Sequence, residues 1–143
     1  MANQNDDAEI RALIARWSKA VRDQDLSGIR ADHDPEILMF DVPPPFLSRG
    51  LDAYMATWDE FLGMQAKPVQ FDFRDIAVAA GTDVAFATAI GTCCDLSSVE
   101  PVNLDFRLTM GLRKIDGKWR IMHEHHSIPA TSGTANPLPG SVP

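Results

Sequence analysis

Residues 116–127, which read Asp-Gly-Lys-Trp-Arg-Ile-Met-His-Glu-His-His-Ser, predict a hairpin turn followed by a strand. Asp116 and Gly117 suit the two central positions of a type I′ turn, because both positions need a positive φ. Side chains alternate across a strand, so one face should carry Trp119, Ile121, His123 and His125. We therefore expect a strand that leaves a packed core and enters a pocket, where imidazoles exchange protons near neutral pH.

Length and charge limit the class of protein. A chain of 143 residues with 45% hydrophobic and 23% charged residues is typical of one globular domain. The formal net charge of −7 argues against nucleic-acid and anionic membrane partners. The polar N-terminus does not resemble a signal peptide, and Cys93 and Cys94 are adjacent, which disfavours a disulfide. We predict a cytoplasmic protein that binds neither nucleic acid nor membrane.

Hydrophobic periodicity places helices in the first half of the chain and long strands in the second. We expect helices at residues 7–22, 26–31 and 50–63, and short strands at 36–42 and 46–49 around the prolines of residues 43–45. The long strands should cover residues 69–79, 84–96, 103–115 and 118–127. Tight turns between these long strands predict an antiparallel meander. Residues 1–128 should form the single domain, followed by a Pro-rich C-terminal arm at residues 129–143.

This order of elements predicts an α+β fold with helices on one face of the sheet. A long antiparallel sheet bends as it twists. We therefore expect the N-terminal helices to pack in a strongly curved antiparallel sheet, which gives a cone-shaped α+β barrel with an internal pocket.

The chain resembles the nuclear transport factor 2-like superfamily, which includes ketosteroid isomerase, SnoaL-like polyketide cyclases, scytalone dehydratase and the kinase association domain. The matching segments are Gly-Lys-Trp-Arg-Ile-Met-His-Glu-His-His-Ser and Met-Phe-Asp-Val-Pro followed by Arg-Gly. The first segment is similar to the end of the calcium/calmodulin-dependent kinase association domain. The resemblance covers about residues 7–127. It implies a homodimer formed through the sheet face and a small-molecule ligand.

Asp41 is the candidate base. In ketosteroid isomerase the general base looks similarly placed, before a Pro-rich turn, so the resemblance assigns this role to Asp41. Neighbours such as Phe40 and Phe46 would remove water from the carboxylate and raise its pKa. The alternative is a strand-end aspartate that binds turn amides. Trp17 falls where the isomerase has its oxyanion tyrosine, and only Asp105 is a loose candidate for the second oxyanion donor.

The hairpin also predicts which histidines face the core. Counted from the turn, Met110 should lie opposite His123, and Leu108 opposite His125, which puts both histidines on the core face. A one-residue bulge would exchange them for Glu124 and His126.

Arg107 has two interpretations in an otherwise apolar strand. An inward guanidinium would hold a carboxylate or enolate. An outward one would pair with Glu124 or Asp105.

His123 and His125 have spacing that also permits metal binding, with Asp41 or His33 as a third ligand. Hydrogen-bonded histidines are the simpler interpretation, and we predict neither a metal nor a cofactor. Tyr54 and Trp58 lie one helical turn apart and would form the lip of the cavity or pack helix on sheet. The candidate substrate-binding residues are Trp17, Phe46, Tyr54, Trp58 and Met110.

We expect a cofactor-independent enzyme of the ketosteroid isomerase-like or SnoaL-like type. Asp41 would abstract a proton next to a carbonyl, and His125, His123 or Arg107 would stabilise the oxyanion. The reaction would be that of an isomerase, cyclase or lyase acting on a small apolar carbonyl compound in the cone pocket. The alternative is a non-catalytic ligand-binding or oligomerisation module like the kinase association domain.

Overall fold

The computed structural model describes residues 4–64, 69–95 and 102–130. These residues form helices and strands in the order α1 (Gln4–Arg22), α2 (Leu26–Arg30), β1 (His33–Phe40), β2 (Ser48–Arg49), α3 (Leu51–Gly63), β3 (Gln70–Ala80), β4 (Val84–Asp95), β5 (Val102–Ile115) and β6 (Lys118–Ser127). The fold is α+β, as predicted, and each expected element is present within a few residues of its predicted bounds. The predicted arm lies outside the described residues from residue 131 onward.

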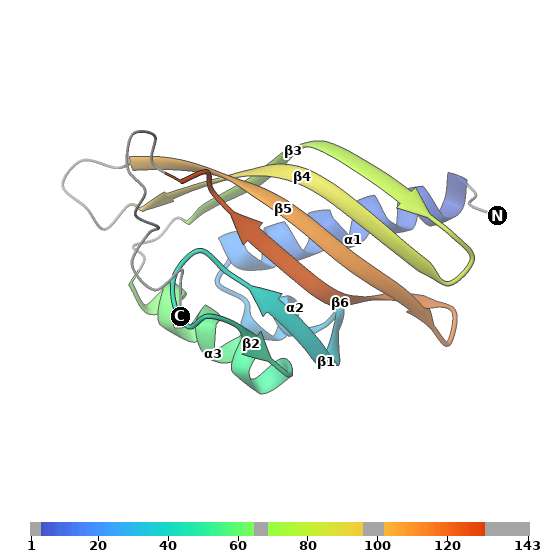
Figure 1. The fold of residues 1–143 in the computed structure, drawn as a ribbon, viewed down its shortest axis with the longest axis horizontal. Coiled ribbons are helices and arrows are strands. Elements are labelled where there is room, and N and C mark those ends of the chain that lie inside the picture. The colour runs from blue at the N-terminus through green and yellow to red at the C-terminus, as the bar shows by residue number, and fades with distance from the viewer. Residues whose placement is uncertain (1–3, 65–68, 96–101, 131–143) are drawn as a thin grey trace.

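A six-stranded sheet has the order β2-β1-β6-β5-β4-β3. Figure 1 shows α1 running along one face of this sheet and α3 lying beside β1. The strands from β3 to β6 form the predicted antiparallel meander. The sheet is mixed, however, and not antiparallel throughout, because β1 pairs with β6 in parallel.

The hairpin between β5 and β6 has the predicted turn. Ile115 lies opposite Lys118, and Asp116 and Gly117 have φ angles of 51° and 78°. These positive values are those that a two-residue type I′ loop requires.

The core lies between α1 and the inner face of the sheet. The apolar positions of α1 repeat at helical spacing, and all of them are buried: Ile10, Leu13, Ile14, Trp17 and Val21. The inner face of β5 supplies Phe106, Leu108, Met110 and Leu112, as the alternation predicts. None of the helices that the structure describes is long and apolar enough to span a bilayer.

The start of α3 is tied to β1. Gly50 has a φ of 91°, a left-handed conformation that disfavours residues with a Cβ, and its amide donates to the carbonyl of Ile37 at 2.7 Å. This hydrogen bond joins the start of α3 to β1, the strand that Asp41 follows.

Candidate functional site

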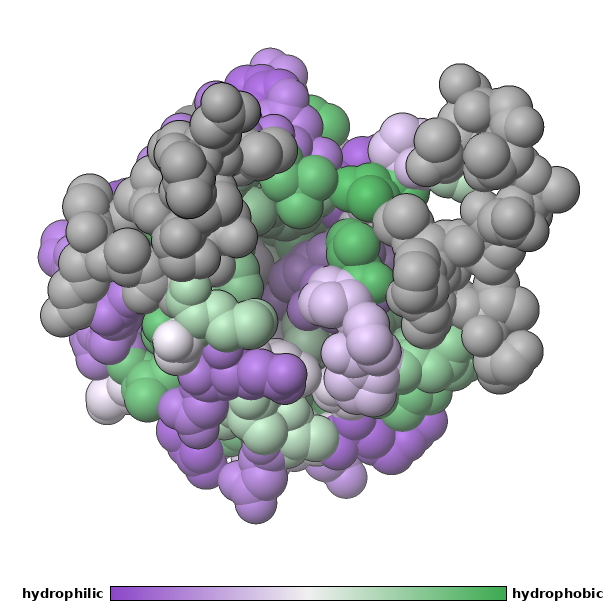
Figure 2. Space-filling model, turned by 90° about the vertical axis from the view of Figure 1, so that its left-hand side faces the viewer, coloured by the Kyte–Doolittle hydropathy of each residue, from purple (hydrophilic) through white to green (hydrophobic). Residues whose placement is uncertain are grey.

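A pocket of about 450 Å³ lies between the end of β4, the start of β5 and the C-terminal half of α3. Figure 2 looks onto this end of the molecule and shows a hollow bordered in part by hydrophobic residues. Most of its wall is aromatic or aliphatic, from Trp58, Phe61, Met64, Phe71, Leu104 and Phe106. The polar side chains of the wall are Asp41, Thr57, Glu60, Cys93 and His126. A mostly apolar pocket with a few polar groups is typical of a small-molecule site.

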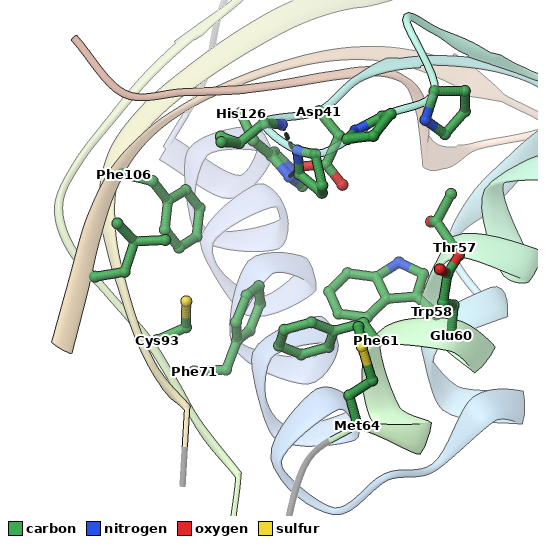
Figure 3. Close-up of a pocket in the computed structure, with 15 residues that line it drawn as sticks. Asp41, Thr57, Trp58, Glu60, Phe61, Met64, Phe71, Cys93, Phe106 and His126 are labelled. Atoms are coloured by element: carbon green, nitrogen blue, oxygen red, sulfur yellow. Dashed lines mark hydrogen bonds and ion pairs between the residues drawn. The ribbon is translucent and has the colours of Figure 1, made fainter. Parts of the chain in front are cut away.

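Asp41 follows β1 directly and lines this pocket, as Figure 3 shows. Its Oδ1 accepts a hydrogen bond from the amide of Val42 at 2.8 Å and lies 3.2 Å from Nδ1 of His126. Among the described residues, none donates a hydrogen bond to the second oxygen, Oδ2. Asp41 therefore satisfies a turn amide and still keeps one oxygen available at the pocket.

The predicted register of β6 is wrong beyond Ile121. Leu112 lies opposite Ile121, but Gly111 lies opposite His123, so Met122 is an extra residue in the strand. This bulge reverses the alternation, and Glu124 and His126 point into the core. It is the one-residue bulge named above as the alternative.

The partner strand explains why the irregularity lies at this point. On β1, His33 lies opposite Ile121, but Leu38 already lies opposite His123. Pro35 falls in this interval and has no amide hydrogen for a ladder. The regular pairing of β6 with β5 and with β1 is therefore interrupted at the same point, between Ile121 and His123.

His126 is the histidine that reaches the pocket. Its side chain is 8% exposed, and its two ring nitrogens contact two carboxylates. Nδ1 lies 3.2 Å from Oδ1 of Asp41, and Nε2 lies 3.0 Å from Oε1 of Glu124. A ring that donates from both nitrogens is an imidazolium. His126 is thus a buried cation between two anions.

Glu124 lies deeper and is fully buried. Besides His126, it contacts Tyr54, whose hydroxyl donates to Oε2 at 2.8 Å, and Nε2 of His33, which also reaches Oε2. These donors come from β6, α3 and β1. A buried carboxylate is stable only when its oxygens are satisfied in this way.

The shifted pKa values follow from these contacts. Burial alone would raise the pKa of Glu124, but His33 and His126 outweigh it and lower the pKa to about 2. Burial alone would lower the pKa of His126, but its hydrogen bonds and its charge attraction to Asp41 and Glu124 raise the pKa to about 9. At neutral pH the site therefore holds ionised Glu124 and protonated His126.

Tyr54 remains a phenol. Burial and the adjacent charge of Glu124 raise its pKa well above the ordinary value of 10.0. Tyr54 therefore acts in this site as a hydrogen-bond donor.

Three of the predicted catalytic residues lie on the opposite face of the sheet: His123 and His125, which the bulge in β6 turned outward, and Arg107 of β5. His123 bonds the carbonyl of Leu38 through Nδ1 at 2.6 Å, and Arg107 is exposed and donates to Oγ of Ser127 at 3.0 Å. His125 lines a second pocket of about 410 Å³, which shares Asp41 and His126 with the first. Partial burial and the positive neighbours His123, His126 and Arg107 lower the pKa of His125.

The predicted substrate-binding residues divide into two groups. Trp58 lines the first pocket, and Phe46, 57% exposed, lines the second. Trp17, Tyr54 and Met110 are buried in the core and line neither pocket, so Tyr54 does not form a lip. Trp17 has no hydrogen-bond partner for Nε1 among the described residues.

Sequence reasoning missed the central pair, Glu124 and His126, in its preferred register. It also began the first strand at residue 36, although His33 is the first residue of β1 and binds Glu124. Within residues 4–64, 69–95 and 102–130, no group of three or more His, Cys, Asp or Glu side chains is arranged to hold a metal ion. Both nitrogens of His126 are turned toward carboxylates instead.

Comparison with known proteins gives a clear family. The profile of the SnoaL-like domain matches residues 10–131. An NTF2-like protein of unknown function from Pseudomonas putida KT2440 has a crystal structure that is 33% identical in sequence, with a TM-score of 0.87 and coverage of 96% of each chain. None of the curated proteins matches the chain.

Two more distant structures share the fold alone. A presumed dehydratase of the NTF2-like family from Streptomyces avermitilis is 13% identical, with a TM-score of 0.79 and coverage of 91% of this chain and 100% of its own. A presumed scytalone dehydratase from Novosphingobium aromaticivorans is 16% identical, with a TM-score of 0.76 and coverage of 94% and 93%.

Proposed function

This chain belongs to the SnoaL-like domain family, and from that premise and the geometry of its pocket we propose an acid–base enzyme. Its substrate is a small, largely apolar carbonyl compound, and its reaction is an isomerisation, cyclisation or elimination. The observation that carries the proposal is the pair of Asp41 and His126, joined at 3.2 Å in the wall of an aromatic pocket.

Asp41 acts as the base. Its free oxygen, Oδ2, takes a proton from the carbon next to the carbonyl, and the electrons of the broken C–H bond form an enolate. The proton then returns from Asp41 to another carbon in an isomerisation, or to a leaving hydroxyl in an elimination. Oδ1 stays fixed by Val42 and His126 during both steps, which keeps the carboxylate oriented.

His126 replaces His123, His125 and Arg107 as the group that balances the developing charge. Its ring nitrogens are used by Asp41 and Glu124, so its contribution is the positive charge of the imidazolium and not a free hydrogen bond. A buried cation stabilises an adjacent enolate more strongly than a cation in bulk solvent does.

The walls of the pocket indicate the kind of substrate. Trp58 and Phe61 from α3 face Phe71 and Phe106 from the sheet, as Figure 3 shows. Aromatic side chains on both sides favour a flat, apolar ligand. Two structures with this fold are named as presumed dehydratases, which supports elimination among the three reactions.

Proton abstraction can be measured without knowledge of the product. A panel of flat carbonyl compounds is incubated with the protein in D2O, and NMR follows deuterium incorporation next to the carbonyl. We expect exchange with the unmodified protein and a loss of about 10²- to 10⁴-fold in Asp41→Asn. Asp52→Asn is the control, because the side chain of Asp52 is 99% exposed on α3, away from the pocket, and should keep the full rate.

Two results would contradict the proposal. The first is an Asp41→Asn variant that exchanges deuterium as fast as the unmodified protein. The second is a panel in which compounds bind, as judged by quenching of tryptophan fluorescence, but none exchanges faster than it does with Asp41→Asn.

A further inference from the structure

Glu124 occupies the centre of the sheet but touches neither pocket. It lies on β6, opposite Met39 of β1 and Met110 of β5, and it is fully buried. No ligand in either pocket could contact it, because it is absent from both walls. Any effect of Glu124 on the chemistry must therefore pass through a neighbour.

That neighbour is His126, which Glu124 contacts through Oε1 at 3.0 Å. The other carboxylate oxygen, Oε2, is held separately by Tyr54 and His33. Because two different elements, α3 and β1, fix Oε2, the carboxylate cannot rotate away from His126 without breaking two buried hydrogen bonds.

The ring of His126 is fixed in turn. Trp17 and Phe106 pack against it, with ring centroids at 6.2 Å and 5.6 Å. Its polar contacts are Glu124 on the core side and Asp41 on the pocket side. A ring clamped at Nε2 presents Nδ1 to Asp41 in one orientation only.

We propose that Glu124 is a positioning residue that fixes the ring of His126 against Asp41, with Tyr54 and His33 as its supports. This inference rests on the proposed function of the Asp41–His126 pair. Glu124 acts by holding the proton on Nε2 and by supplying a second negative charge next to the imidazolium. It touches no reacting atom.

A merely structural Glu124 would behave differently. If it only satisfied buried donors, its replacement would reduce stability and leave the titration of His126 unchanged. If it positions His126 and stabilises its positive charge, its replacement must shift the pKa of His126. The groups that face His126 are Asp41 from the segment after β1 and Glu124 from β6, and His125 lies next to it in sequence on the outer side of β6 with a lowered pKa.

NMR titration of the histidine ring signals decides between these roles without a substrate. In the unmodified protein His126 should titrate near pH 9, far above the ordinary value of 6.5. In Glu124→Gln its pKa should fall by about 1 to 2, because one of the two opposing charges is removed. Glu36→Gln is the matched control, since it makes the same change of charge at an exposed position of β1 and should leave the pKa of His126 within about 0.5 of the unmodified value.

Two outcomes overturn the inference: a His126 that titrates below about pH 8 in the unmodified protein, or an unchanged titration in Glu124→Gln. The first needs no variant, so it can overturn the inference even if Glu124→Gln does not fold. With an accepted substrate, Glu124→Gln should lower kcat and leave KM nearly unchanged. Deuterium exchange in Asp41→Asn tests the proposed function separately, so that either idea can fail alone.

Discussion

The hydroxyl of Tyr54 donates to Oε2 of Glu124 at 2.8 Å, across 70 residues of sequence. Tyr54 belongs to α3, the helix that also carries Trp58 and Phe61 into the pocket wall. Glu124 belongs to β6, which carries His126. One buried hydrogen bond thus joins the helix that carries the apolar wall of the pocket to the strand that carries its charged wall. This bond in the core helps to set the distance between the two walls.

Loss of this link should reduce stability. Tyr54→Phe keeps the ring and removes only the hydroxyl that Glu124 accepts from. A hydrogen bond to a charged group contributes about 1.5 to 3 kcal/mol, and we expect the free energy of unfolding to fall by that amount. Urea denaturation measures it, and a change below about 0.5 kcal/mol would mean that Glu124 finds another donor.

The buried charges also predict how stability depends on pH. His126 has a folded pKa of about 9, above its ordinary 6.5, so its contribution is complete below pH 6.5 and is lost as pH rises through 9. Glu124 has a folded pKa of about 2, below its ordinary 4.5, so its contribution is complete above pH 4.5 and is lost as pH falls toward 2. Stability should therefore be greatest between about pH 5 and 6.5.

Thermal unfolding at a series of pH values checks this profile. In His126→Gln the decrease on the alkaline side should become shallower, because the group that loses its proton there is gone. A melting temperature that rises steadily from pH 6.5 to 9 would contradict the assignment of His126 as the buried cation.

Local signals predicted most of this fold. The Asp116–Gly117 turn fixed the first pairs of the hairpin, and alternation along β5 placed Phe106, Leu108 and Met110 inside. Helical spacing likewise identified the buried face of α1. Each of these features depends on residues close in sequence, so local sequence patterns are sufficient to predict it.

Which side chains of β6 reach the pocket depends on the bulge, and the bulge depends on tertiary pairing between strands. The bulge at Met122 arises where β6 must pair with β5 on one side and with β1 on the other, and β1 is interrupted near Pro35. The parallel pairing of β1 joins segments more than 80 residues apart, as the 85 residues between His123 and Leu38 show, and no local pattern reports it. The bulge could be named from sequence as an alternative, but only the second neighbour of β6 selects it.

Gly91 should be essential for the shape of the pocket. A Cβ at Gly91 would lie 2.3 Å from Cζ of Phe106, which must then leave its place beside His126. We expect Gly91→Ala to reduce stability by about 1 to 3 kcal/mol and to weaken ligand binding, since the displaced ring of Phe106 is part of the pocket wall.

Gly111→Ala provides the control on the neighbouring strand. There a Cβ would meet Cβ of His123 at 3.4 Å, which is an ordinary contact. Stability and the affinity for an apolar fluorescent dye should both stay close to those of the unmodified protein. Equal effects of the two substitutions would show that the contact with Phe106 does not matter.

The outer face of the sheet is the surface through which we propose that two copies associate. On β4, Val84 and Phe86 are 58% and 55% exposed, and Phe86 lies opposite Gly111, which leaves its ring uncovered on that side. Large exposed hydrophobic residues on the outer face of a sheet favour burial against a second copy. We expect light scattering to give twice the 15.7 kDa mass of the chain, and Phe86→Glu to give the monomer.

Phe46→Glu is the exposure-matched control, because Phe46 is 57% exposed but lies in the segment after β1 and not on this face. It should remain dimeric. A monomer in the unmodified protein would contradict the proposed association, and dissociation by Phe46→Glu alone would place the contact elsewhere. A ring larger than a dimer would favour an assembly module over an enzyme.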